Sequence, residues 1–335
     1  MADNKDVVRL ILDVMRGTPQ QYSMTEAKDA LRAMVLDYTG GVTKVTRQSI
    51  RDGSFKQLFS ILEEVLPTVV TDVLAGNEIY KRFVDERRIG YGDVNRFLLQ
   101  DSTLFEVSNI ADGVGAIRRQ RITGPRAVSI TTALNGVKVY ADEDQILGGK
   151  LDITDVIERV ARSMVVKYLT GVLIAFNGLV SDNLNGNYIS DVGAFDEDAI
   201  SLMIETVQAD TEQPAIIIGT ARALRNLQLP TTANAAQNEL AALGYYANWY
   251  GTPVLSVNQR YLPGTKEFIF PSDTITILAG DDKFIKLIRE GDALIDEWQP
   301  HDNPDRSWEY LYRERSGIGI ACGIGTISLA RYTFA

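Results

Sequence analysis

The first 60 residues carry two amphipathic helical patterns. Ser23-Met24-Thr25-Glu26 is a capping box, and the apolar residues after it keep a helical spacing up to Gly40-Gly41. A second helical stretch starts at Ser54 and reaches Pro67, where we predict that the helix ends. Both apolar stripes are typical of packing surfaces.

Between residues 87 and 141 the pattern changes to short strands separated by turns. The predicted strands are Val94–Gln100, Leu104–Asn109, Gly115–Ile122, Arg126–Ala133 and Gly136–Ala141, with Asn135-Gly136 as a tight turn. Residues 87–126 are too polar to form a good core, and a long two-stranded projection is marginally stable alone in water. The pattern therefore predicts a projection that lies on another molecule.

The strongest helical pattern runs from Asp152 to Asn177. Apolar residues follow the three- and four-residue spacing without interruption, and Gly178 is placed to end the helix. A helix of about 26 residues would extend about 39 Å. We interpret it as a long core helix.

Strands and helices alternate after this helix. Asp196 is expected to cap a helix, and further on the chain ends with two apolar runs, Trp308–Arg315 and Gly317–Tyr332. The predicted elements between them are strands at Pro214–Gly219, Pro253–Asn258, Glu267–Phe270 and Thr274–Leu278, a helix at Thr220–Gln228, and a helix or turn at Glu239–Tyr250. This alternation favours an α+β chain with an α/β lobe.

Charged residues are unevenly distributed. The 335-residue chain has 34 Lys+Arg and 44 Asp+Glu, which gives a formal net charge of -10. Residues 181–300 hold seven basic and seventeen acidic residues, whereas residues 81–126 hold nine basic and six acidic, with Arg118, Arg119 and Arg121 as the densest group. A solvated face would explain this distribution, and so would a basic element of one subunit that meets an acidic surface of another. The acidity argues against nucleic acid as the main ligand.

Several kinds of chemistry are excluded by composition and motifs. One Cys, Cys322, and one His, His301, cannot form an intrachain disulfide or the usual zinc sites. Gly40-Gly41-Val42-Thr43-Lys44 lacks the spacing of a phosphate-binding loop, and Gly317-Ile318-Gly319 lacks the third glycine of a dinucleotide fingerprint. We therefore expect no catalytic, cofactor or metal site.

The order of the elements resembles that of the major capsid proteins of tailed bacteriophages, the Hong Kong 97-like fold. The resemblance is carried by Pro214-Ala-Ile-Ile-Ile-Gly219 with the helix after it, and by Tyr250-Gly251-Thr252-Pro253-Val254-Leu255 leading to Asn258. It implies an α+β fold with a long spine helix, an extended β-hairpin loop, an α/β axial domain and an N-terminal helical arm.

The resemblance also implies a division of the chain. The expected parts are an N-terminal arm at 1–60, a peripheral domain at 61–86, 128–180 and 301–335 with its spine helix at 152–177, an extended loop at 87–127, and an axial domain at 181–300. Inter-subunit contacts are expected at Arg118, Arg119, Arg121, Phe97 and Phe105.

The implied function is that of a major capsid protein, not an enzyme. Copies would form hexamers and pentamers, and these would close into an icosahedral head around double-stranded DNA. Expected partners are a separate scaffolding protein, a portal, and decoration or cement proteins, with no cofactor, membrane or sequence-specific DNA contact. Assembly is expected in the host cytoplasm and the product in the virion capsid. An encapsulin compartment shell and an α/β enzyme are the alternatives.

Covalent cross-linking of the shell is not expected. Some members of the family cross-link through a lysine on the extended loop, but no lysine occurs here between Lys81 and Lys138. Boiled and reduced shells should therefore run on a denaturing gel as one band at the 37.0 kDa of the single chain. A ladder of multiples of this mass would contradict the prediction.

Overall fold

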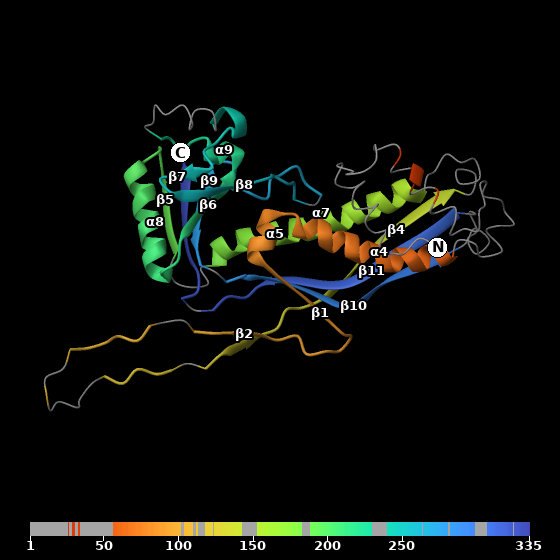
Figure 1. Ribbon diagram of the computed structural model, residues 1–335, viewed down its shortest axis with the longest axis horizontal. Coiled ribbons are helices and arrows are strands. Elements are labelled where there is room, and N and C mark those ends of the chain that lie inside the picture. Colours follow the sequence, from red (N-terminus) through yellow and green to blue (C-terminus); the bar gives the residue numbers. More distant parts are fainter. Residues whose placement is uncertain are drawn as a thin grey trace.

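The computed structural model describes residues 56–101, 104–109, 112, 118–122, 124–142, 153–182, 188–229, 240–262, 264–280, 282–298, 307–323 and 325–335, together with 26, 29, 30 and 33. Most of the predicted arm at 1–60, with the helix between Ser23 and Gly40, lies outside these residues, and so does His301. In the described part, one of two larger sheets runs beneath a long helix and the other lies near one end of that helix, and a narrow two-stranded projection extends away from them (Figure 1).

The described elements alternate between helix and strand along most of the chain. The helices are α4 (Lys56–Ala75), α5 (Glu78–Phe83), α7 (Ile153–Asp182), α8 (Glu197–Thr211) and α9 (Ala221–Leu224). The strands are β1 (Val84–Ile89), β2 (Phe97–Leu99), β3 (Arg126–Val128), β4 (Ala133–Asp142), β5 (Tyr188–Gly193), β6 (Ala215–Thr220), β7 (Asn248–Trp249), β8 (Thr252–Val257), β9 (Thr274–Ala279), β10 (Ile285–Trp298), β11 (Ser307–Ile320) and β12 (Ser328–Phe334).

A four-stranded sheet in the order β1-β10-β11-β4 lies beneath the helices α4 and α7 (Figure 1). β1 pairs with β10 in parallel, and the other pairs are antiparallel. The core between sheet and helices is apolar and includes the rings of Phe83, Phe176 and Phe284, whose centroids lie 5.4 to 5.9 Å apart. Burial of this surface is the main force that holds the helices on the sheet.

α7 contains the long helix predicted from the apolar spacing. Its buried residues recur at the expected intervals, for example Met164, Tyr168, Val172 and Phe176. The predicted end at Gly178 is wrong, because α7 continues to Asp182. Gly178 costs about 1 kcal/mol relative to alanine inside a helix. Leu179, 5% exposed, offsets this cost by burying an apolar side chain.

α4 runs through Pro67 instead of ending there. A proline inside a helix costs about 3 kcal/mol, because one hydrogen bond is lost and the ring crowds the preceding turn. The residues that follow outweigh this cost, since Val69, Val70 and Leu74 are fully buried against the core. The proline rule is local and does not include the apolar surface that the following turns bury.

Asn135-Gly136 does not form the predicted tight turn, and lies within β4 instead. Asn135 pairs with Glu314 and Gly136 with Arg313 across the β4–β11 ladder. The Asn135 amide donates to Ser316 Oγ at 2.8 Å. A Cβ at position 136 would lie 3.1 Å from the carbonyl oxygen of Tyr312, so the glycine permits a close approach of the two strands. The Asn-Gly pair thus serves strand packing.

The second sheet has six strands in the order β5-β12-β9-β6-β8-β7. The helices α8 and α9 cover one of its faces through apolar residues such as Ile200 and Leu224. The opposite face contributes Ile216, Ile218 and Leu278 to the core that contains α7. Asp196 caps α8 as expected, because its carboxylate accepts hydrogen bonds from the backbone amides of residues 198 and 199.

The predicted boundary between the axial domain, which ends at residue 300, and the last peripheral segment, which begins at residue 301, does not match the strand pairing of the two sheets. β10 was placed in the axial part, but it lies between β1 and β11 in the four-stranded sheet. β12 was placed in the peripheral part, but it lies between β5 and β9 in the six-stranded sheet. The chain therefore crosses between the sheets twice near its C-terminus. Pairing between residues far apart in the sequence decides which sheet each strand joins, and the local pattern of apolar residues does not reveal that choice.

The window Arg159–Leu179 of α7 is long and apolar enough to cross a membrane by length and composition, with a mean hydropathy of 1.2. In this structure 56% of it is buried inside the protein, where it serves as the core helix. Among the described residues, no group of three or more His, Cys, Asp or Glu side chains could hold a metal ion.

Gly317 in β11 and Gly178 in α7 offer a matched test of close packing. A Cβ at position 317 would lie 2.3 Å from the carbonyl oxygen of Thr131, whereas one at position 178 would meet only a side-chain carbon of Ile320 at 3.8 Å. Gly317→Ala should lower the free energy of unfolding by about 1–3 kcal/mol. Gly178→Ala should leave it unchanged or raise it by about 1 kcal/mol. Denaturant unfolding of the unassembled chain measures both, and equal effects would contradict this packing.

Candidate assembly surfaces

The projection consists of two limbs joined near their base by the β2–β3 ladder. Phe97 pairs with Val128 and Leu99 with Arg126. Beyond this ladder the described residues 104–109 and 118–122 are not in regular strands, so the strands predicted there are wrong for those residues. Gln120 links the two limbs instead, because its amide donates to the Glu106 carbonyl at 2.7 Å and accepts from the Glu106 amide at 2.9 Å. In Figure 1 the limbs extend far beyond the two larger sheets.

Glycines in and after β11 allow both limbs to lie against that segment. At Gly317 and Gly319 an added Cβ would collide with Thr131 and Ile130 of the returning limb. At Gly323 it would lie 2.2 Å from the carbonyl oxygen of Gln100 on the outgoing limb. Side chains larger than hydrogen are thus excluded where the projection crosses the sheet. Small and apolar residues alternate in the run Gly317–Tyr332, a pattern that suits a strand with close neighbours.

Phe97 is buried in the chain's own core, at 2% exposure, so the structure does not support it as an inter-subunit contact. Its ring packs with Ile130 and Ile288 on the face of β10 that points away from α7. The Arg87 guanidinium lies 4.3 Å above the ring centroid, which adds a cation–π contact. Phe97 therefore fixes the base of the projection.

The outer part of the projection exposes apolar side chains to solvent. Val107 is 94% exposed, and the exposed fractions of Leu104, Phe105 and Ile122 lie between 53% and 78%. Arg118, Arg119 and Arg121 are also exposed on this part. Phe105 and the three arginines thus remain available to a partner. An extended ribbon that gathers apolar and cationic side chains has the character of a protein interface.

A buried arginine joins the strand that leads into the projection to the rest of the core. Arg289 of β10 is 1% exposed, and its Nε lies 3.2 Å from a Glu86 carboxylate oxygen on β1 and 3.4 Å from a Glu314 carboxylate oxygen on β11. Its Nη1 donates to Thr71 Oγ1 of α4 at 2.9 Å. The hydroxyl of Tyr168 on α7 donates to Glu314 at 2.8 Å.

The charges in this cluster compensate each other. Desolvation alone would lower the pKa of Arg289, but Glu314 and Glu86 outweigh it and raise that pKa, so the guanidinium stays charged. Desolvation, strengthened by Glu314, raises the pKa of Tyr168, so its hydroxyl keeps the proton that it donates. The cluster lies inside the protein, where Arg289 Nε and Nη2 and Glu86 Oε1 are held by charge attraction without a hydrogen bond.

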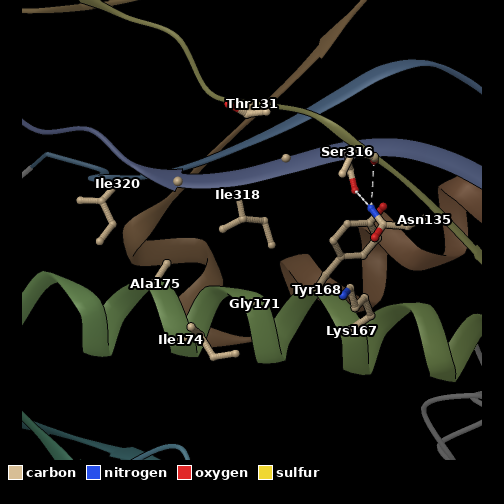
Figure 2. Close-up of a pocket in the computed structure, with 13 residues that line it drawn as sticks. Thr131, Asn135, Lys167, Tyr168, Gly171, Ile174, Ala175, Ser316, Ile318 and Ile320 are labelled. Carbon is tan, nitrogen blue, oxygen red and sulfur yellow. Dashed lines mark hydrogen bonds between the residues drawn. The ribbon is translucent and has the colours of Figure 1, made fainter. Parts of the chain in front are cut away.

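A groove of about 510 Å³ runs between α7 and the β11–β4 side of the sheet. Figure 2 shows Ile318 and Ile320 of β11 facing Gly171, Ile174 and Ala175 of α7. Lys167 stands at one end, and the hydrogen-bonded pair Asn135 and Ser316 lies beside it. Aliphatic residues and glycines make up most of the lining, as expected where a helix packs on a sheet.

Comparison with known proteins identifies the family to which this chain belongs. A family model described as "SPbeta prophage-derived putative capsid protein YonB" matches residues 7–328 of the chain. The chain belongs to this capsid protein family. No curated protein sequence matches it.

Solved structures confirm the fold that the family implies. A capsid chain of bacteriophage PhiM1 aligns with a TM-score of 0.53 and 8% identity over 77% of this chain and 87% of that chain. A capsid chain of the native GTA particle aligns with a TM-score of 0.50 and 14% identity over 76% and 89%. At these identities the likeness shows the fold alone, which is the tailed-phage, Hong Kong 97-like capsid fold expected from the sequence.

Family and fold together confirm the main functional expectation. The chain is a major capsid protein, a structural component of an icosahedral shell rather than an enzyme, and its place is the virion capsid. The sequence missed the features that position the projection, namely Arg289 with its two carboxylates and the glycines of the C-terminal segment. The closely spaced glycines of the C-terminal segment are a sequence signal for close packing. The arginine cluster has no such signal, because its members are far apart in the sequence.

The arginine cluster predicts that two glutamates of β11 contribute differently to the free energy of unfolding. Glu314→Leu removes one of the two carboxylate partners of Arg289 and the acceptor of the Tyr168 and Tyr312 hydroxyls. It should cost about 3–5 kcal/mol, because the guanidinium keeps only the more exposed Glu86 and two buried hydroxyls lose their acceptor. Glu309→Leu removes a partly exposed ion pair with Lys138 and should cost less than about 1 kcal/mol. Denaturant unfolding compares the two, and similar losses would contradict the importance of the cluster.

Proposed function

We propose that this capsid protein assembles into hexamers and pentamers in which the projection of each copy lies over a neighbouring copy. The apolar side chains at the outer end of the projection support the proposal. Val107, Leu104 and Ile122 are all more than three-quarters exposed, so the chain itself does not bury them. Surface of this kind gains its hydrophobic stabilisation when a neighbour covers it.

The distribution of charge supports the same arrangement. Arg118, Arg119 and Arg121 lie exposed on the projection, while the net negative charge of the chain is concentrated between residues 181 and 300. A basic ribbon and an acidic lobe on the same chain attract each other when copies lie side by side. The acidic lobe also suits a shell that encloses double-stranded DNA without sequence-specific contacts.

The remaining partners follow from the capsid role. Assembly in the host cytoplasm on a separate scaffolding protein, a portal at one vertex, and decoration or cement proteins on the outer surface complete the proposed head. An encapsulin shell has the same fold but encloses enzyme cargo. Electron microscopy of the purified protein, followed by analysis of the contents, separates these roles: nucleic acid inside particles from infected cells supports the head, and protein cargo contradicts it.

Charge reversal tests the proposed role of the projection. The triple change Arg118→Glu, Arg119→Glu and Arg121→Glu should abolish closed shells, because each copy then presents a negative ribbon to an acidic neighbour. The chain should remain folded, since these residues are exposed and away from the core. Negative-stain microscopy and sedimentation measure the assembly.

The control reverses two exposed basic residues elsewhere, Lys81 and Arg82 at the end of α5. Lys81→Glu with Arg82→Glu should still give shells. Normal shells from the triple variant would refute the proposed contact, while its family membership and fold would be unaffected.

A further inference from the structure

The six-stranded lobe presents two chemically different surfaces on opposite sides of its sheet. One surface is the outer face of α8. Its helix has no basic residue, and Asp198, Leu202 and Glu205 follow each other at intervals of four and three, so they lie on one stripe. All three are exposed, and Leu202 is 64% exposed. The α8 stripe is therefore an apolar residue flanked by carboxylates.

The other surface is a hairpin between β8 and β9, formed by residues 259–270 apart from 263. Tyr261 and Phe268 form a bridge, and their rings stack with centroids 5.1 Å apart and planes 13° apart. The two side chains are 57% and 50% exposed. Lys266 is exposed near the tip, where the amide of Thr265 donates to the Leu262 carbonyl at 3.0 Å.

The base of this hairpin fixes the side on which it lies. Phe270 belongs to the core that contains α7, and its ring centroid lies 5.6 Å from that of Phe176. The α7 residue Asn177 donates to the Ile269 carbonyl at 3.3 Å. α8 belongs to the other core, on the opposite face of the sheet. In Figure 1, α8 lies on the outer side of the lobe and the hairpin after β8 extends the other way, above α7.

Two stacked and half-exposed aromatic rings are a costly surface to leave in water, and are typical of a contact site. The hairpin carries Arg260 and Lys266 and one acidic residue, Glu267, whereas both charged residues of the α8 stripe are acidic. The two surfaces are complementary in charge, and each offers apolar area to the other. Because they lie on opposite sides of the same lobe, one copy cannot satisfy both by itself.

We propose that the hairpin of one copy docks on the α8 stripe of the next copy, with Tyr261 and Phe268 against Leu202 and Lys266 against Glu205. Such a contact is head-to-tail, and it forms a ring when the rotation between copies is that of the proposed hexamers and pentamers. The charges set the direction of the contact and oppose pairing of two like surfaces. This inference rests on the proposed assembly into hexamers and pentamers and names the lobe contact within it.

A charge swap on the full-length protein tests the contact. Lys266→Glu and Glu205→Lys alone should each raise the protein concentration needed for half-maximal shell assembly by about tenfold. The double variant carrying both changes restores the pair in reverse and should return to within about twofold of the parent. Phe268→Ser should weaken assembly in any charge background. Light scattering measures the assembly, and circular dichroism confirms that each variant is folded.

Matched controls lie on the four-stranded sheet. Lys283 is exposed just before β10, and Leu294 is 45% exposed within it. Lys283→Glu and Leu294→Ser should assemble like the parent. If the parent forms shells and both single charge variants assemble equally well, or if the double variant is not rescued, the hairpin contact is refuted while the shell function stands. If the parent forms no assemblies at all, the proposed function itself fails.

A cross-linking measurement is independent of charge. Leu202→Cys with Thr265→Cys places one thiol on each surface, and a short bismaleimide added to assembled protein should give a ladder of multimers on a denaturing gel. The parent, whose one cysteine is Cys322, is the control for background cross-linking. A double-cysteine variant that assembles but yields no more multimer than the parent would overturn the inference.

Discussion

The architecture depends on the compensation of one buried positive charge. Arg289 lies where α4, α7 and three strands of the four-stranded sheet meet, and its guanidinium is neutralised by Glu86 and Glu314. An uncompensated charge at this depth would cost several kcal/mol, so the elements that bear the partners must come together. Glu86 lies on β1, the strand that leads into the projection. The polar cluster therefore links the helix layer to the part of the chain that reaches out of it.

The same sheet is covered on both sides, which explains the unbroken burial of the first half of β10. Ile285 and Leu287 face the core with α7, whereas Ile288 faces Phe97 and Ile130 at the base of the projection. A strand buried on both faces loses the alternation of apolar and polar residues, and in β10 the buried Lys286 and Arg289 stand among the apolar residues. The ammonium of Lys286 lies 3.5 Å from a carboxylate oxygen of Asp85 and 3.5 Å from one of Asp282.

The sequence predicted what local pattern controls and failed where distant parts of the chain decide. The long helix, the cap at Asp196 and the strand before Thr220 follow from periodicity and capping chemistry within a few residues. Pro67 and Asn135-Gly136 were assigned by local rules that packing overrides. Of the proposed contact residues, the arginines and Phe105 stayed accessible, while Phe97 was buried by residues 130 and 288. No local signal distinguished these two phenylalanines.

The double crossing near the C-terminus has a mechanical consequence. One crossing leads from β9 to β10 and the other from β11 to β12, and they are joined where the amide of Ala321 donates to the Phe284 carbonyl at 2.8 Å. Gly280, at φ +132°, lies so close to Thr326 that a Cβ there would be 2.4 Å from the Thr326 carbonyl oxygen. Two tethers held side by side resist torsion of one sheet against the other far more than a single hinge would. A load applied to the lobe, such as outward pressure from a packed interior, is therefore passed to the four-stranded sheet as tension shared by two strands.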